Sequence, residues 1–271
     1  MSRKFDPVRE RSALLKHYLP IMPAFAPDSV RVTALPGYVQ FMIISITQLY
    51  WFGLGDRARR ALVGVLDWMD SSGPPSPDHW PQDKYHYREA PTAHFHWWES
   101  VGLGRWLLGR EGVDAAFAFA VQVEWDGWRQ ATPTEQEQDR GNRQNILSER
   151  LAVALCAGLP DYAARFCEAT QLRQPFLSVK PMWEFGQWAS TYLVQGQARD
   201  ETFVGKGQGA LRKTLLEYYE PSSAWVEATL WLKAIYFDGG VTRTAQETIF
   251  RAYDCMPGIP RPDFVNPAAG D

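Results

Sequence analysis

The sequence predicts an all-α protein, and two observations lead to that prediction. Apolar residues recur with the 3.6-residue period of a helix in three long segments, whereas the strict apolar and polar alternation of a strand is almost absent. The 271 residues, 45% hydrophobic and 22% charged, supply enough apolar material for a sizeable core. We therefore expect about ten helices packed as antiparallel helical hairpins, without a significant sheet.

The first strongly apolar segment begins at Tyr38 and reads YVQFMIISITQLYWFGLG. Its polar members are Gln40, Ser45, Thr47 and Gln48. It falls short of the ~20 predominantly apolar residues that a membrane span needs. This segment predicts a buried helix in a protein that does not span a membrane.

Amphipathic helices follow. After Asp56, which suits an N-cap, apolar residues share one helix face at Ala58, Ala61, Leu62, Val65, Leu66 and Met69. The same spacing recurs at Val113, Ala116, Phe117, Ala120 and Val121, and again at Trp225, Ala228, Leu232 and Ile235. Other helices are expected to begin near residues 6, 92, 142, 161, 181, 209 and 242.

The chain is predicted to form a single domain over residues 1–256. The polar stretch 131–142, ATPTEQEQDRGN, would separate possible halves at 1–131 and 142–256, and a Pro-rich irregular tail would occupy 257–271. The three cysteines are widely spaced and odd in number, and the charged N-terminus does not resemble a secretion signal. We therefore expect a cytoplasmic protein.

Several classes of function are disfavoured. A formal net charge of −3 argues against direct binding of nucleic acid, which depends on clustered Lys and Arg. The segment GKGQGA, from Gly205, fits a dinucleotide-binding turn, but the βαβ context that such a turn requires is missing. No catalytic residue can be assigned, so we expect a protein that is not an enzyme.

Four of the five histidines lie between Asp78 and Ser100. Together with Glu89 or Glu99 they could bind a metal, and a metal-dependent helical enzyme using the cluster from His79 to Glu99 is one alternative. His94 and His96, however, are two residues apart and point in different directions on a helix. The sequence therefore predicts no metal and no cofactor.

Charge and aromatic content indicate a protein-binding surface. Between Glu111 and Asp139 there are seven acidic residues and one basic residue, which gives −6 in a chain whose total is −3. An acidic block of this kind suits a basic partner. The predicted partner-binding residues are Glu124, Asp126, Glu135, Glu137, Asp139, Glu217, Tyr218, Tyr219 and Glu220.

In general texture, an all-helical and Trp-rich chain ending in SSAWVEATLWLKAIYFDGG, this sequence resembles the helical immunity proteins that protect bacteria from polymorphic or type VI secreted toxins. The resemblance implies a non-enzymatic cytoplasmic protein that occludes a cognate toxin, often a nuclease with a basic surface. It carries over no specific binding residue. A helical-repeat adaptor is the other alternative, although the repeat period expected of one is missing.

Overall fold

The computed structural model describes residues 16, 19–20, 22, 24–31, 34–51, 54–74, 76, 89–130, 149–150, 152–159, 161–162, 226–227, 229–230 and 233. These include a 3-10 helix, η1 (Pro27–Ser29), and the α-helices α2 (Leu35–Trp51), α3 (Gly55–Ser72), α4 (Glu89–Leu108) and α5 (Val113–Gln130). Short helical stretches at 149–150, 152–156, 161–162, 226–227 and 229–230 complete this part of the chain, in which no residue lies in a strand. The described residues are therefore consistent with the all-α class.

The predicted total of about ten helices also depends on residues outside these ranges. The polar loop 131–142 and the tail 257–271 lie outside the described residues as well. The single domain over 1–256 and its possible halves therefore stay predictions.

Helix α3 has the predicted amphipathic face. Its buried residues are Ala58, Leu62, Val65, Leu66 and Met69. The predicted N-cap was wrong by two residues, because the Ala58 N–H donates to the Leu54 carbonyl at 2.9 Å and Leu54 is the residue that caps the helix. Asp56 lies instead in the first turn, where a carboxylate interacts favourably with the helix dipole.

Helix α2 is the buried helix that its apolar sequence predicts. Residues 42–50 are all buried, including the polar Ser45, Thr47 and Gln48. The Thr47 hydroxyl donates to the Ile43 carbonyl at 2.7 Å, which satisfies this polar group within the helix itself. None of the helices in the described ranges is both long and apolar enough to cross a membrane.

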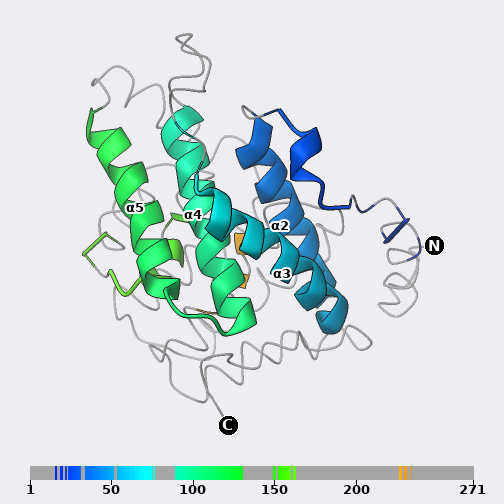
Figure 1. Cartoon of the computed structure of the whole chain (residues 1–271). Helices are drawn as coiled ribbons and strands as arrows, with labels where there is room; N and C mark the ends of the chain where they lie inside the picture. The colour runs from blue at the N-terminus through cyan, green and yellow to red at the C-terminus, as the bar shows by residue number, and fades with distance from the viewer. Residues whose placement is uncertain are drawn as a thin grey trace, which may run out of the picture.

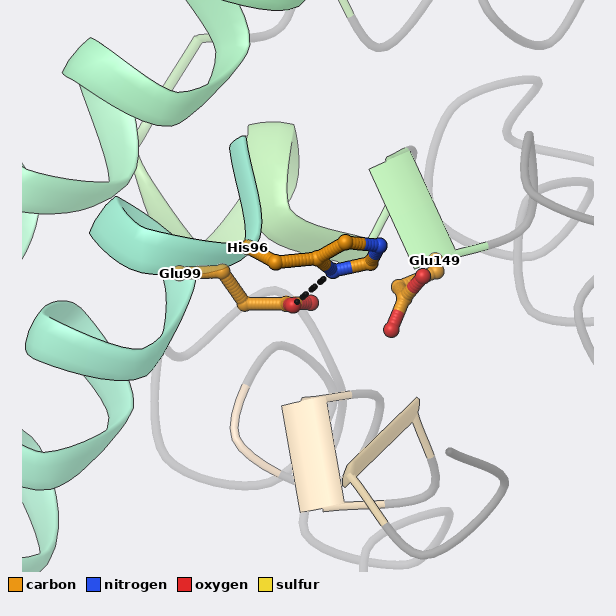
Figure 2. A group of neighbouring side chains, drawn as sticks. All are labelled: His96, Glu99 and Glu149. Atoms are coloured by element: carbon orange, nitrogen blue, oxygen red, sulfur yellow. Dashed lines mark hydrogen bonds and ion pairs between the residues drawn. The ribbon is translucent and has the colours of Figure 1, made fainter. Parts of the chain in front are cut away.

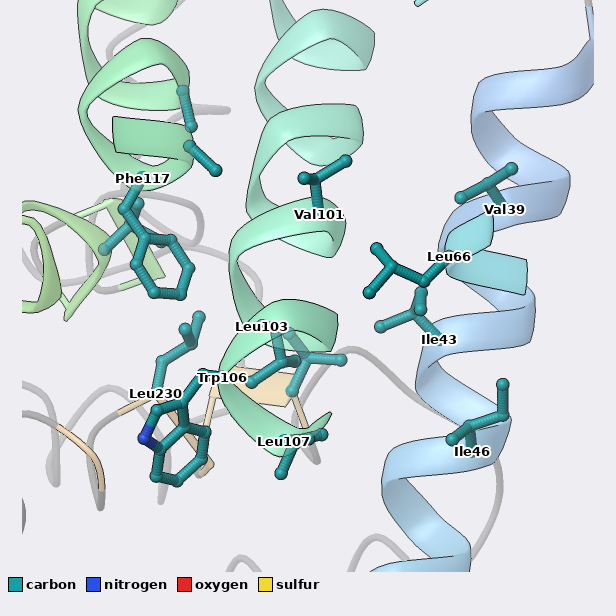
Figure 3. Packing of buried hydrophobic residues seen from close by; sticks show 14 of the residues in the cluster. Val39, Ile43, Ile46, Leu66, Val101, Leu103, Trp106, Leu107, Phe117 and Leu230 are labelled. Atoms are coloured by element: carbon teal, nitrogen blue, oxygen red, sulfur yellow. The ribbon is translucent and has the colours of Figure 1, made fainter. Parts of the chain in front are cut away.

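Helix α4 lies at the centre of this arrangement, with α5 on one side and α2 and α3 on the other (Figure 1). Two glycines permit this packing. A Cβ on Gly102 would lie 2.7 Å from Cδ1 of Phe117 in α5, and a Cβ on Gly104 would lie 3.3 Å from Cδ1 of Leu66 in α3. Figure 3 shows Val101, Leu103 and Trp106 of α4 in the apolar core formed with these neighbours. Because α4 is buried on opposite sides, it lacks the one-sided pattern of α3.

Helices α4 and α5 form an antiparallel hairpin closed by a short turn. The backbone N–H of Gly109 donates to the Trp106 carbonyl at 3.1 Å, and that of Arg110 donates to the Arg105 carbonyl at 2.8 Å. This is the Schellman pattern, which requires a left-handed residue, and Gly109 has φ of 67°. The turn explains why α4 ends at Leu108 and α5 begins at Val113, because residues 109–112 between them contain two glycines.

Distant segments complete the core. Residues 152–154 and 156 are buried beside Val226 and Leu230, and the Cys156 thiol donates to the Leu230 carbonyl at 3.3 Å. The four residues of the predicted helical series from Trp225 all lie outside the described residues. Its neighbours Val226 and Leu230 nevertheless belong to the same apolar cluster as α2 to α5.

Candidate functional site

A group of polar side chains lies inside this helical core. His96 and Glu99 are three residues apart on α4, so they share one face of the helix. Glu149 reaches them from the short helical stretch at 149–150, and one donor atom from each residue lies within 4.8 Å of the other two. Figure 2 shows the imidazole with the two carboxyl groups turned toward it.

The imidazole of His96 is held from two helices. Its Nδ1 atom lies 3.0 Å from Oε2 of Glu99 and 3.0 Å from Nε2 of Gln40, which belongs to α2. The tautomer decides which of these contacts Nδ1 serves as donor or as acceptor. An Nδ1 that carries a proton donates to Glu99, and an Nδ1 without one accepts from Gln40, so α4 orients the ring in one tautomer and α2 in the other.

Arg150 supplies the positive charge of the group. Its Nη1 atom lies 3.3 Å from Oε2 of Glu149, and its guanidinium carbon lies 4.2 Å from the centre of the Phe95 ring. The side chain is almost completely buried, at 2% exposure. A guanidinium that is desolvated over an aromatic face and paired with a carboxylate is stabilised by both contacts.

Burial dominates the electrostatics of the two carboxyl groups. Burial raises the pKa of Glu99 from its ordinary 4.5 to about 8, although the charge of Arg150 opposes the shift. It also raises the pKa of Glu149 to about 7, and repulsion from Glu99 adds to the effect while His96 and Arg150 oppose it. One guanidinium therefore does not compensate two buried carboxylates, and near neutral pH the pair retains a proton when no other cation is present.

Two residues of the alternative metal cluster, His96 and Glu99, belong to this group, whereas the structure does not place the other predicted site residues in it. His94 and Glu89 lie on α4 with His96, and His79 and His86 lie outside the described residues. Glu124 and Asp126 lie on α5, whose side chains are described only as far as Val123. Glu135, Glu137, Asp139, Glu217, Tyr218, Tyr219 and Glu220 lie outside the described residues, so all nine binding residues stay predictions.

Sequence reasoning missed Glu149, Arg150 and Gln40. It compared His94 with His96, which do not share a helix face, and did not compare His96 with Glu99, which do. The spacing HWWE, from His96 to Glu99, was the available signal. Nothing in the sequence pairs this spacing with a glutamate 50 residues beyond Glu99.

A second feature lies on the surface of the α4–α5 hairpin. The rings of Trp98 and Phe119 stack with their centres 5.1 Å apart and their planes 24° apart. Phe119 is 54% exposed, whereas Trp98 is partly buried against the core. The exposed carboxylates of Glu111 and Asp114 lie near the start of the same helix.

The described part of the chain is therefore helical, with a buried His–Glu–Glu–Arg group and a partly exposed aromatic pair. Neither a protein-family model, nor a curated protein, nor a solved structure was found to match the chain.

Proposed function

We propose that the protein is a non-enzymatic binding protein of the cytoplasm that neutralises a basic bacterial toxin by forming a direct complex with it. In this proposal a single domain of about ten helices presents an acidic surface to the toxin. The function is that of an immunity protein in a polymorphic or type VI secretion system. The observation that carries the proposal is the exposed Phe119, stacked on Trp98, on a helix whose start also carries exposed carboxylates.

The aromatic pair has the properties of an interface anchor. An exposed Phe alone is ordinary on a protein surface. Phe119, however, is held against the flat ring of Trp98, so little side-chain entropy remains to be lost when a partner covers it. Rigid aromatic residues of this kind commonly contribute most of the binding energy at the centre of an interface.

The charge around the pair favours a basic partner. Glu111 and Asp114 are exposed, and five further acidic residues follow before residue 140. Glu124 and Asp126 belong to this proposal by their charge and their place in α5.

Two further groups of residues, one acidic and one aromatic, are included in the proposal on the basis of the sequence alone. Glu135, Glu137 and Asp139 would steer a basic toxin toward the complex, because exposed charges act mainly on the rate of encounter. Tyr218 and Tyr219, flanked by Glu217 and Glu220, would serve as additional aromatic anchors.

The experiment measures both the survival of cells that express the toxin and the formation of a complex between the two proteins. The chain is co-expressed with the toxin-domain protein encoded immediately upstream of its gene, and the purified mixture is examined by size exclusion with light scattering. We expect cells to survive the toxin and the two proteins to elute as a one-to-one complex. Absence of a complex, or of a toxin domain beside the gene, would contradict the proposal.

A further inference from the structure

The buried group has the composition of a metal site. His96 offers an imidazole nitrogen, and Glu99 and Glu149 each offer a carboxylate oxygen. Ligand atoms with bonds of ~2.1 Å to a tetrahedrally coordinated ion are ~3.4 Å apart, so donors within 4.8 Å of one another need to close by up to about 1.4 Å. The 3.0 Å between Nδ1 of His96 and Oε2 of Glu99 already matches neighbouring ligands around one ion.

Two oxygen atoms in the group need a positively charged or donating partner. Oε1 of Glu99 and Oε1 of Glu149 are buried, and neither accepts a hydrogen bond unless one carboxyl carries a proton that it shares with the other. The side chains of Glu99 and Glu149 are only 2% and 7% exposed, so solvent does not satisfy these atoms. Buried polar atoms without partners are costly, and a bound cation would satisfy both.

With both carboxyl groups ionised, the group carries an excess negative charge that a proton or a cation can offset. With both carboxyl groups ionised and His96 neutral, Arg150 compensates only one of two negative charges. A divalent ion changes the net charge of the group from −1 to +1. Such an ion could contact Oε1 of Glu149. Arg150 donates to Oε2 of the same carboxyl group and does not contact Oε1.

We propose that His96, Glu99 and Glu149 bind one divalent first-row transition ion, which holds α4 to the segment at 149–150. The mixed nitrogen and oxygen donors favour Zn²⁺ or Mn²⁺ over Mg²⁺, which binds mainly through oxygen and keeps its waters. Because His96 is only 14% exposed and the two glutamates less, the role is to stabilise the fold and does not depend on the toxin partner.

Equilibrium dialysis and calorimetry with Zn²⁺ on the full chain, after removal of metals by chelation, test the proposal. We expect one ion per chain and a rise in the melting temperature when Zn²⁺ is added. Each of His96→Ala, Glu99→Gln and Glu149→Gln should weaken binding at least tenfold, since every variant removes one ligand. Mg²⁺ should bind at least tenfold more weakly than Zn²⁺.

His94→Ala is the matched control. His94 lies on the same helix two residues before His96, about 200° around the axis, so its removal should leave Zn²⁺ affinity unchanged. Thermal melts confirm that each variant is folded. A wild-type chain without stoichiometric Zn²⁺, or a Glu149→Gln variant with wild-type affinity, overturns the proposal.

Co²⁺ gives a result that does not depend on any variant. The Co²⁺-bound wild-type chain should show ligand-field absorption without the strong charge-transfer band of a thiolate ligand, because the three ligands are nitrogen and oxygen donors. A thiolate band would place the ion at a cysteine and overturn the assignment.

Discussion

The Nδ1 atom of His96 lies 3.0 Å from Oε2 of Glu99, one turn further along α4. This pair, and Glu149 opposite it, forms a polar group inside a helical core that is built mainly from aliphatic and aromatic side chains. The group contains two carboxyl groups and one guanidinium. Its stability must therefore depend on protons or on a cation.

The free energy of unfolding of the metal-free protein should fall as the pH rises. The pKa of Glu99 is raised to about 8 and that of Glu149 to about 7, so between pH 4.5 and these values the folded chain holds more protons than the unfolded chain. Stability contributed by these carboxyls is complete below the unfolded pKa and is lost as pH passes the folded pKa.

Urea unfolding with a chelator, at about pH 5.5 and about pH 8.5, measures this loss. The comparison with Glu99→Gln isolates the carboxyl, because glutamine cannot titrate and the variant should lose less stability over the same interval. Parallel pH profiles for the two proteins would show that Glu99 titrates with an ordinary pKa.

Gly102→Ala should destabilise the fold by about 1–3 kcal/mol through overpacking. Its new Cβ would lie 2.7 Å from Cδ1 of Phe117. The Phe117 ring is completely buried, so it has no open space into which it could move. Thermal and urea unfolding measure the change.

Gly64→Ala is the matched control for that variant. Gly64 lies within α3, and a Cβ there would have no neighbour within 4 Å. It should gain up to about 1 kcal/mol from helix propensity. A neutral Gly102→Ala would mean that α4 and α5 do not approach as closely as described.

The fold and the site differ in how far the sequence predicts them. The face of α3 follows directly from its spacing, because one side is buried and the other is exposed. The faces of α4 cannot be predicted in this way, since Gly102 and Gly104 pack against different helices. A spacing pattern identifies a helix face only when solvent covers the opposite one.

The candidate site required contacts that no local pattern contains. His96 and Glu99 could be paired from helix geometry, but Glu149 and Gln40 come from other parts of the chain. Which distant residues meet depends on how the helices pack. The expectation that no metal is bound weighed all four histidines with Glu89 or Glu99, but it tested only His94 and His96 for a shared helix face and so did not consider His96 with Glu99.

Phe119→Ala should speed dissociation of the toxin complex at least tenfold, about 1.4 kcal/mol, if the aromatic pair is a buried anchor. Phe41→Ala on α2 is the control, because Phe41 is similarly exposed, at 41%, but lies on another helix. Surface plasmon resonance gives the dissociation rates. Equal effects of the two variants would remove the α4–α5 surface from the proposed interface.

Replacing Glu135, Glu137 and Asp139 with Lys should slow association with a basic toxin and reduce the salt dependence of the association rate. Exposed charges steer encounter and are screened beyond ~8–10 Å at physiological salt. Stopped-flow association at low and high salt measures both effects. An unchanged association rate would show that this acidic stretch does not face the partner.

Crystals of the protein grown with Zn²⁺, and diffraction data collected at the zinc absorption edge, test the central claim most directly. We predict one anomalous peak per chain within bonding distance, ~2.0–2.2 Å, of a ring nitrogen of His96 and carboxylate oxygens of Glu99 and Glu149. A map with no peak between these three side chains, at a zinc concentration that saturates the protein in solution, would contradict the claim.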